Sequence, residues 1–454
     1  TSGRRSMQRR RTSGLSNAIV QISRRATRIA QRITGPLALL AVGIVLMSAC
    51  TDAATPAEDG PIVTVFGGYR GVEAERFAAS LTPFEQQTGI TVRYIGTGSF
   101  AKAIEARVAD ADYPDVAIFP QPGLIRQYAQ QGLLIPLDDD TQATVERSQE
   151  TAVSAVGDVL YSVWFRASIK SLVWYEPQVF AERGYQVPTT WDGMMDLTNR
   201  MQTEGFSPWC LSIESFGATG WVGTDWIEDI VLRQSGPDIY DQWIDNEVSF
   251  EDESIIAAFE TFGGIVHTPG RVFGGTFRIL NAPWTKAQDP MFEDPPRCLL
   301  NRQGSVQQAN LPSSVAIGTE TDVFVLPAMD EAQPPILVAG EFAAAFSDRP
   351  EVHALLEYLA TPEAGVGWAE AGGFVSPHHS FDSRLYGDDL DRRMGEILRG
   401  ADVVRFDASD LMLPSVGTGT FWTGMKTYVR TGDARGAAAQ IQAGYPTIEL
   451  YEAE

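Results

Sequence analysis

Short apolar runs and amphipathic stretches alternate near the start of the folded part of the chain. Three compact runs, Ile62–Phe66, Ile90–Ile95 and Asp115–Phe119, are rich in β-branched and aromatic residues and are each followed by glycine or proline. Between them, apolar residues recur at helical spacing over 73–89 and 100–109. Alternation of strand and helix is typical of right-handed crossovers in a parallel sheet. We therefore expect an α/β fold that begins with parallel strands flanked by helices.

The carboxyl ends of these strands are the first places to look for a ligand site, because ligands of open α/β sheets collect there. In this sequence those ends are 67–71, 96–100 and 119–121. They contain Ser99 and Gln121, which are candidates for polar contact with a ligand.

The chain becomes strand-like again over 161–165 and 171–175, with Lys170 between the two runs. An unpaired ammonium in such apolar, aromatic surroundings is costly. We therefore expect Lys170 to meet a carboxylate, which is either a structural partner or part of a ligand cleft.

The stretch Ser215–Trp226 combines three glycines, two tryptophans, three hydroxyl residues and Asp225. Glycine allows close approach of the backbone to a ligand, and tryptophan offers a wide apolar face with one polar N–H. Asp225 followed by Glu228 predicts a capped helix start, and Gly236-Pro237 predicts the end of that helix. The stretch is thus a candidate binding loop, with a tryptophan-anchored turn and a capping aspartate as the alternative.

A body of about 400 residues exceeds what one hydrophobic core usually holds, so two lobes are expected. Further strands are predicted over 321–327 and 336–342, and helices toward the C-terminus. Several crossings of the chain between lobes predict a hinge. The expected N-terminal lobe comprises residues 61–165 and 331–384, and the C-terminal lobe comprises residues 166–330 and 385–454.

The first 49 residues carry the features of an export signal. Residues 4–32 contain nine arginines and no acidic residue, and residues 36–49 form a mostly apolar run that is short for a transmembrane helix. Leu46–Cys50 resembles a bacterial lipobox, which implies cleavage before Cys50, lipid on its sulfur and a tether over 50–60. A plain secretory signal with an incidental cysteine is the alternative.

Loss of this segment changes the formal charge from −23 by nine units to −32. A strongly acidic body argues against nucleic acid as a partner. It is compatible with a neutral ligand and disfavours an anionic one unless local cations compensate.

The chain has three cysteines. If Cys50 carries lipid, Cys210 and Cys298 are an even pair in an oxidising compartment, which favours a disulfide. Two buried thiols are the alternative. A disulfide closing so long a loop could contribute up to ~4–5 kcal/mol in the chain-entropy model.

Signatures of enzymes are scarce in this sequence. It contains no phosphate loop, dinucleotide fingerprint, Gly-x-Ser-x-Gly elbow or His-Glu-x-x-His motif. This predicts a binding protein without cofactor or metal. Paired carboxylates for glycoside hydrolysis stay possible among 58 acidic residues, because their separation in space is not readable.

Loops that mix aromatic, glycine and planar polar residues suit a neutral sugar, whose hydroxyls pair with carboxylates and amides and whose C–H faces stack on flat rings. Each tryptophan also fits a core position, and each polar candidate also fits a solvated surface or a helix cap. One hypothesis is that Trp221 stacks on a glucose ring while Asp225 and Glu341 hold hydroxyl pairs from opposite walls. The candidate ligand residues are Glu73, Ser99, Gln121, Lys170, Trp174, Trp221, Asp225, Trp284 and Glu341.

The chain after the signal resembles the extracellular solute-binding proteins of bacterial ABC importers, in their carbohydrate-binding branch. The generic likeness lies in Phe84–Ile90, Pro114–Ala117, Lys170–Tyr175 and Arg349–Val352. A narrower likeness to the α-glucoside-binding subgroup lies in Pro208–Cys210, Gly217–Trp221 and Thr224–Asp229.

This resemblance implies a two-lobed periplasmic-binding-protein-like fold, each lobe a mainly parallel sheet flanked by helices, with a hinge of crossing segments. It implies a monomer at the extracytoplasmic face of the membrane that holds a sugar between its lobes, closes, and docks on a membrane permease driven by an ATPase. It also supports the pairing of Cys210 with Cys298. A secreted glycoside-active enzyme and a surface adhesion or signalling lipoprotein stay open as other functions.

Overall fold

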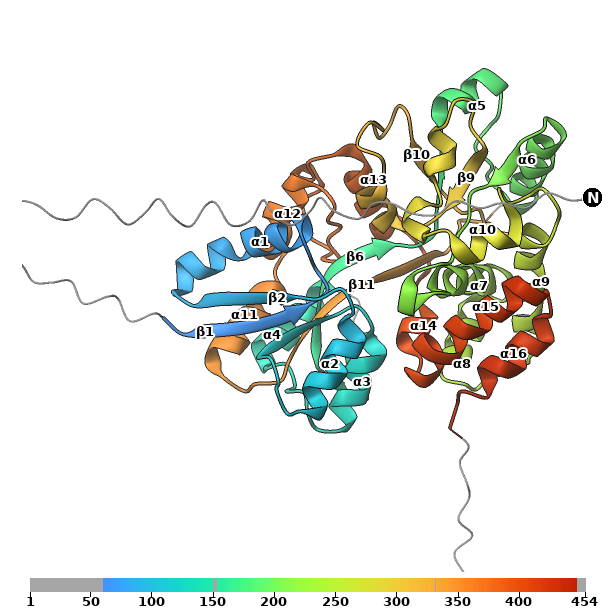
Figure 1. Cartoon of the computed structure of the whole chain (residues 1–454). Helices are drawn as coiled ribbons and strands as arrows, with labels where there is room; N and C mark the ends of the chain where they lie inside the picture. The colour runs from blue at the N-terminus through green and yellow to red at the C-terminus, as the bar shows by residue number, and fades with distance from the viewer. Residues whose placement is uncertain (1–59, 150–152, 331, 447–454) are drawn as a thin grey trace, which may run out of the picture. The chain divides into compact units, whose positions relative to one another are not determined.

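The computed structural model describes residues 60–149, 153–330 and 332–446 (Figure 1). The described residues all belong to one compact unit. The predicted export signal, Cys50 and the tether up to residue 59 lie outside the described residues. Among the helices within the described ranges, not one combines the length and the apolar character needed to cross a membrane.

The first sheet has six strands, in the order β12-β11-β3-β1-β2, with β6 also paired to β11. β1 runs parallel to both β2 and β3, as the alternation of strands and helices predicted. β11 runs antiparallel to β3 and β6 and parallel to β12. The strands are β1 (Ile62–Gly67), β2 (Thr91–Gly96), β3 (Val116–Phe119), β6 (Ser162–Ile169), β11 (Ile336–Ala345) and β12 (Val404–Phe406).

Glycine sets both ends of α1 (Val72–Thr88). Gly71 precedes the helix at φ 53° and Gly89 follows it at φ 71°, and glycine adopts such backbone conformations without strain. The apolar face of α1 is buried in the core of the first sheet. The other helices associated with this sheet are α2 (Phe100–Ala109), α3 (Pro122–Gln130), α4 (Asp139–Ser148), α11 (Pro350–Leu359) and α12 (Val366–Ala371).

The second sheet has the order β10-β7-β9-β8. β7 runs antiparallel to β9 and β10, and β8 runs parallel to β9. The expectation of a mainly parallel sheet is therefore wrong for this half of the chain, because an apolar run identifies a strand but its direction is set by its partners in space. The strands are β7 (Leu172–Tyr175), β8 (Ser207–Trp209), β9 (Cys298–Arg302) and β10 (Asp322–Val325), and a separate hairpin contains β4 (Ala155–Val156) and β5 (Val159–Leu160).

A disulfide joins Cys210 to Cys298, as predicted, with 5.4 Å between the Cα atoms. Cys210 follows β8 and Cys298 opens β9, so the bond connects two neighbouring strands of the second sheet. It lies beside Met291 in a small buried cluster.

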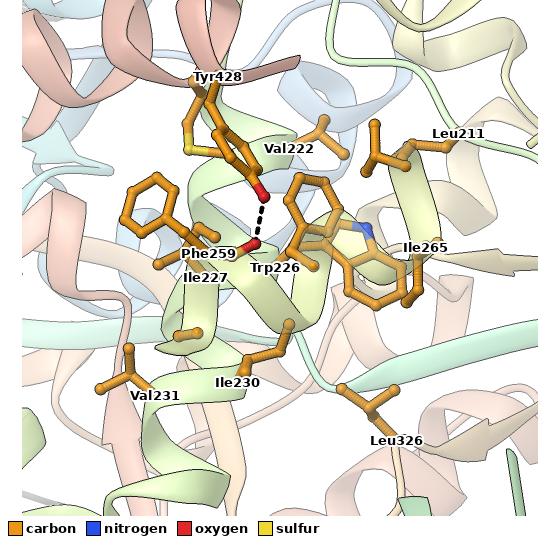
Figure 2. Close-up of a cluster of buried hydrophobic side chains, with 14 of the residues drawn as sticks. Leu211, Val222, Trp226, Ile227, Ile230, Val231, Phe259, Ile265, Leu326 and Tyr428 are labelled. Atoms are coloured by element: carbon orange, nitrogen blue, oxygen red, sulfur yellow. Dashed lines mark hydrogen bonds between the residues drawn. The ribbon is translucent and has the colours of Figure 1, made fainter. Parts of the chain in front are cut away.

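α7 (Trp221–Gln234) is the most deeply buried helix of the second half. Figure 2 shows Trp226 in the middle of this core, among Leu211, Val222 and Ile265. Tyr428 packs nearby and donates a hydrogen bond to the carbonyl oxygen of residue 259. The other helices of this half are α5 (Pro177–Arg183), α6 (Trp191–Thr203), α8 (Gly236–Ile244), α9 (Glu253–Val266), α10 (Gly275–Asn281), α14 (Ala408–Leu411), α15 (Trp422–Thr431) and α16 (Ala434–Gln442). Helix α13 (Asp389–Gly400) instead packs through Leu390 and Met394 into a core cluster that contains residues of both sheets.

The predicted start of α7 is wrong. The helix begins at Trp221, after Gly220 at φ 126°, and Asp225 lies inside it rather than at its cap. The reason is that Gly220 packs tightly against the backbone of Trp422 and turns the chain into the helix early. The predicted break at Gly236 is confirmed, since α7 ends at Gln234 and α8 begins at Gly236.

The chain passes from the first sheet to the second at Lys170–Ser171, between β6 and β7. β11 accompanies β6 along most of its length. The boundaries of the two lobes at residues 165, 331 and 385 stay a prediction.

Candidate functional site

A cavity of about 470 Å³ lies where β6 and β11 meet the first turn of α1. Its size is within the range of small-molecule sites. The short helix η4 (Ser305–Asn310) and helix α13 supply further walls. The lining residues that carry the following argument are Glu73, Arg166, Gln308, Glu341, Trp368, Gly373, Asp388 and Asp391.

Arg166 organises the charged wall of this cavity. It stands directly opposite Glu341 in the antiparallel pairing of β6 and β11, so both side chains project from one face of the sheet. Nε and Nη2 of Arg166 donate to the two oxygens of Glu341 at 3.0 and 2.9 Å, and Nη1 donates to Glu73 Oε1 at 2.9 Å. The guanidinium carbon lies 5.0 Å from the ring centre of Tyr69 and 4.7 Å from that of Trp368. Contact with two rings and two carboxylates fixes the plane of the guanidinium.

The charge on Arg166 is compensated inside the protein. Burial disfavours the cation, but the nearby Glu341 and Glu73 carboxylates outweigh burial and hold the pKa of Arg166 well above its usual value. The side chains of Glu73 and Glu341 are 39% and 18% exposed, so solvent reaches both. A ligand that brings hydroxyl donors complements these carboxylates, whereas an anionic ligand meets surplus negative charge.

Glu73 and Glu341 are the two sequence-predicted residues that line this cavity, and both bond to Arg166. Sequence analysis missed Arg166. The signal was available, because Arg166 follows Trp164-Phe165 in an apolar strand, just as Lys170 follows Ile169. The cost of burying an unpaired cation, which singled out Lys170, applies equally to Arg166.

Lys170 meets carboxylates, as expected for a buried ammonium. Its Nζ lies 3.0 Å from Asp225 Oδ1 and 3.1 Å from Asp407 Oδ2, and the three side chains are 9%, 1% and 2% exposed. Burial alone would lower the pKa of Lys170, but the neighbouring carboxylates raise it. Burial also raises the pKa of Asp225 to about 6 in spite of Lys170. Arg302 reaches Asp225 from β9 at 3.3 Å, so the cluster ties the β6–β7 junction to α7, β9 and the end of β12.

Asp225, Glu228 and Asp407 bring carboxylate oxygens within 4.8 Å of one another, a spacing that would suit a metal ion. Two of these carboxylates contact the Lys170 ammonium. Glu228 accepts hydrogen bonds of 3.1 and 3.2 Å from two backbone N–H groups at the start of α14. The chemistry of the cluster therefore fits an internal ion pair with backbone donors better than a metal site.

The three tryptophans predicted to contact ligand, Trp174, Trp221 and Trp284, do not line the 470 Å³ cavity. Trp221 and Trp284 are half-buried and pack edge to face with ring centres 5.0 Å apart. The Lys170 ammonium lies 4.7 Å from the Trp221 ring centre. Trp174 is only 1% exposed and donates from Nε1 to the carbonyl of Gln303 at 2.9 Å, which is a core position.

Ser99 and Gln121 also lie outside this lining. Ser99 is exposed before α2. Gln121 precedes α3, and its side-chain oxygen is buried without a hydrogen-bond partner among the described residues. Asp225 likewise lies in the Lys170 cluster rather than in the cavity lining.

Comparison with known sequences identifies relatives over nearly the whole chain. A family model described as bacterial extracellular solute-binding protein matches residues 70–278. The osmoprotective compounds-binding protein GgtB of Synechocystis sp. is 41% identical over 413 residues, which is 90% of this chain and 98% of that protein. The alpha-glucosides-binding periplasmic protein AglE of Rhizobium meliloti is 34% identical over 403 residues, which is 86% of this chain and 88% of that protein.

Solved structures with similar folds include several sugar-binding proteins. A chitin oligosaccharide binding protein superposes with a TM-score of 0.71 at 15% identity, covering 85% of this chain and 98% of that one. Maltose-bound MalE3 of T. maritima superposes with a TM-score of 0.64 at 16% identity, covering 84% of this chain and 98% of that one. At such identities the likeness concerns the fold.

These comparisons confirm the α/β, two-lobed fold class and the family resemblance inferred from sequence motifs. The family model and the two relatives are named as binding proteins, so the prediction of a binding protein rather than an enzyme is confirmed.

Proposed function

This chain belongs to the family of bacterial extracellular solute-binding proteins, and from that premise we propose that it captures an uncharged α-glucoside for an ABC importer. Because the family consists of extracellular proteins, we expect this protein outside the cytoplasm. The proposed binding site is the cavity walled by Glu73, Arg166 and Glu341.

The observation that carries this proposal is that Arg166 is already hydrogen-bonded to two carboxylates, those of Glu73 and Glu341, and that both carboxylates are accessible from solvent. The N–H groups of Arg166 donate mainly to Glu341 and Glu73, so Arg166 does not attract an anionic ligand. The carboxylates in turn have oxygen lone pairs left for hydroxyl donors. The rings of Trp368 and Tyr69 pack against the Arg166 guanidinium and restrict its orientation. A neutral, hydroxyl-rich molecule is the ligand that such a wall complements.

The relatives narrow the ligand class. One binds osmoprotective compounds and the other binds α-glucosides by name. A small α-glucoside such as trehalose or sucrose belongs to the overlap of these two classes. Trp221 and Trp284, which form a half-buried pair, are candidates for contact with a larger glucoside.

We propose that the two lobes, with boundaries near residues 165, 331 and 385, close on the ligand. A ligand favours closure only through its additional affinity for the closed form. The long strands β6 and β11 are suited to act as the hinge, because they run side by side and lead toward both sheets. The closed form would then be recognised by the permease.

The test is calorimetric titration of the mature protein with maltose, trehalose and sucrose, with glucose 6-phosphate as an anionic counterpart. We expect binding of at least one neutral glucoside, recovered intact, and none of the phosphate ester. Glu341→Gln should weaken that binding by ~1–3 kcal/mol, because a charge-assisted acceptor is lost. Glu105→Gln on the exposed side of α2 is the matched control and should bind as the wild type does.

Absence of stabilisation by every neutral glucoside in a thermal-shift assay would overturn this ligand assignment. A ligand at about a hundred times its dissociation constant adds ~2.7 kcal/mol, which is readily measured. Equal binding by Glu341→Gln and the wild type would move the site away from the cavity.

We also propose that Cys50 carries a lipid that holds the protein on the membrane. The support is the sequence Leu46–Cys50 together with the arginine-rich segment before it. The wild type should fractionate with membranes and incorporate labelled palmitate, and Cys50→Ser should do neither. A Cys50→Ser protein that stays in the membrane fraction would contradict this anchor.

A further inference from the structure

Two carboxyl groups stand side by side in the cavity wall that α13 supplies. Asp388 caps this helix, and its Oδ1 accepts a hydrogen bond from the backbone N–H of Asp391 at 2.8 Å. Gln308, from η4, donates its side-chain amide to Asp388 Oδ2 at 3.2 Å. Both aspartates and Gln308 line the cavity. The carboxyl pair is therefore part of the proposed ligand site, on an element that contributes neither Arg166 nor Glu341.

Asp391 is held in an unusual position for a carboxylate. Its residue is 0% exposed, and one oxygen accepts a hydrogen bond from the N–H of Gly373. The other oxygen, Oδ1, is buried without a hydrogen-bond partner within the described part of the chain. A buried charged oxygen without a partner is costly, whereas a proton on one member of the pair turns mutual repulsion into a hydrogen bond. The two carboxyl groups are neighbours beside the same loop: Asp388 Oδ2 and Asp391 Oδ2 lie 3.0 and 3.9 Å from the position that a Cβ atom on Gly372 would take.

The loop opposite the pair is shaped to approach it. Gly372 and Gly373 both adopt positive φ, at 85° and 79°. A Cβ atom on Gly372 would lie 3.0 Å from Asp388 Oδ2, so the backbone can come this near only because the residue is glycine. The loop thus packs directly against both groups, with Gly372 beside Asp388 and the Gly373 N–H bonded to Asp391.

The cations near the pair are engaged with other groups. Arg76 of α1 donates to the carbonyl of Gly372 at 2.7 Å, and Arg166 of β6 bonds to Glu341 and Glu73. Within the described residues, neither Asp388 nor Asp391 forms a salt bridge. Burial first, and then Asp388, raise the pKa of Asp391 to about 7. The titratable and charged groups around Asp391 are Asp388 on α13, Tyr386 before it, Arg399 beyond Tyr386, Glu73 and Arg76 on α1, Arg166 on β6 and Glu341 on β11.

We propose that Asp388 and Asp391 form a proton-sharing pair. In this pair Asp388 accepts a hydrogen bond from a ligand hydroxyl and Asp391 positions Asp388, so that ligand capture is coupled to proton uptake. This inference rests on the proposed function. A ligand that fills the cavity removes water from the pair and raises the cost of holding two negative charges there. The bound form therefore holds the shared proton more tightly than the free form.

The sign of the pH dependence follows from this difference. When binding raises the pKa of an acid, affinity is greatest where the acid is protonated in both forms. Affinity then falls as pH rises through the pKa of the free form and levels off above the pKa of the bound form. With a free value of about 7, the loss occurs between pH 6 and pH 8 or slightly above. A difference of about one unit between the two forms corresponds to a tenfold loss of affinity.

The experiment is calorimetric titration of the mature protein with the glucoside that it binds best, at pH 6 and pH 8, in two buffers of different ionisation enthalpy. We expect about fivefold weaker binding at pH 8 than at pH 6, and a buffer-dependent heat at pH 8 that reports proton uptake. Asp391→Asn should abolish both effects, because the amide cannot titrate. Asp389→Asn is the matched control, since Asp389 lies on the same helix with 89% of its side chain exposed and pairs with Arg392 at 2.7 Å. It should keep the wild-type pH dependence.

Circular dichroism would reveal whether Asp391→Asn folds. A second variant keeps the proposal testable if it does not. Asp388→Asn should weaken binding at pH 6, because a ligand contact is lost, and should also remove the proton uptake. A wild type that binds no glucoside at either pH would defeat the proposed function. A wild type that binds equally at both pH values without proton uptake, or folded variants that retain the uptake, would defeat only the proton-sharing pair.

Discussion

Replacing Lys170 by methionine is the sharpest probe of the buried charge cluster that supports both sheets. Methionine keeps most of the hydrocarbon volume but removes the ammonium, which lies 3.0 Å from Asp225 and 3.1 Å from Asp407. Each contact is worth ~5 kcal/mol by Coulomb's law at an effective dielectric constant of ~20. The ammonium also has to be desolvated, which offsets much of this gain. Removing one partner of a buried pair typically costs ~3–5 kcal/mol, because a charge is left without compensation.

The assay is equilibrium unfolding in urea at pH 7, with ΔG obtained for the wild type and the variant. The matched control is Lys286→Met, since Lys286 is 58% exposed and lies 3.3 Å from Asp289 on the surface. That change should cost ~0–1 kcal/mol, as expected for an exposed ion pair. The deficit of Lys170→Met should be smaller at pH 5 than at pH 8, because at low pH an uncompensated carboxyl group of the cluster takes up a proton.

The result that would refute this reasoning is a loss of stability in Lys170→Met no larger than in Lys286→Met. It would mean that Asp225 and Asp407 obtain full compensation from other groups, with Arg302 the first to examine. A deficit that grew toward low pH would contradict the assignment of the uncompensated charge to the carboxylates.

Three further predictions follow from single contacts. Replacing Cys210 and Cys298 together by alanine should lower the free energy of unfolding by up to ~4–5 kcal/mol, because the bond spans 88 residues, and reduction of the wild type should reproduce the loss in thermal melts. Gly340→Ala should destabilise the fold, because a Cβ there would collide with the backbone of β6, whereas Gly264→Ala in α9 meets open space and should unfold at or above the wild-type midpoint. Burial first, and then a nearby carboxylate, raise the pKa of Glu176 to about 7, so the native state binds its proton more tightly than the unfolded chain and loses stability as pH rises from 4.5 toward 7. Glu176→Gln should therefore stabilise the protein at pH 8 relative to the wild type and change it little at pH 4, and a stability gain confined to low pH would contradict this.

Local patterns were sufficient to predict the elements whose signals lie within one short stretch. The strands near residues 62, 91 and 116 and the helix that ends at Gly89 have the expected types and nearly the expected limits. Their apolar period and their terminal glycines or prolines are properties of a few consecutive residues. The pairing of Cys210 with Cys298 was also accessible, because an oxidising compartment leaves an even pair few alternatives.

The candidate site was only partly accessible from the sequence. Glu73 and Glu341 were singled out as carboxylates that could hold sugar hydroxyls, and they do line the cavity. Trp174 has the composition of a stacking residue but is buried in a core, since a ring that suits a sugar suits a hydrophobic contact equally well. Asp225 was expected at a helix cap and lies inside the helix, because its true partner, Lys170, is 55 residues away.

The amino-acid sequence by itself indicated an α/β binding protein with an acidic body and the motifs of a solute-binding family, and it predicted an export signal, because composition and short-range pattern are properties of consecutive residues. Only the tertiary structure decided that Arg166, Glu73 and Glu341 form one wall and Asp388, Asp391 and Gln308 another. These residues are brought together by strand pairing and helix packing across nearly the whole length of the chain. Burial then decides which of the many acidic groups stay charged, pair with a cation or share a proton, and burial is a property of the folded molecule alone.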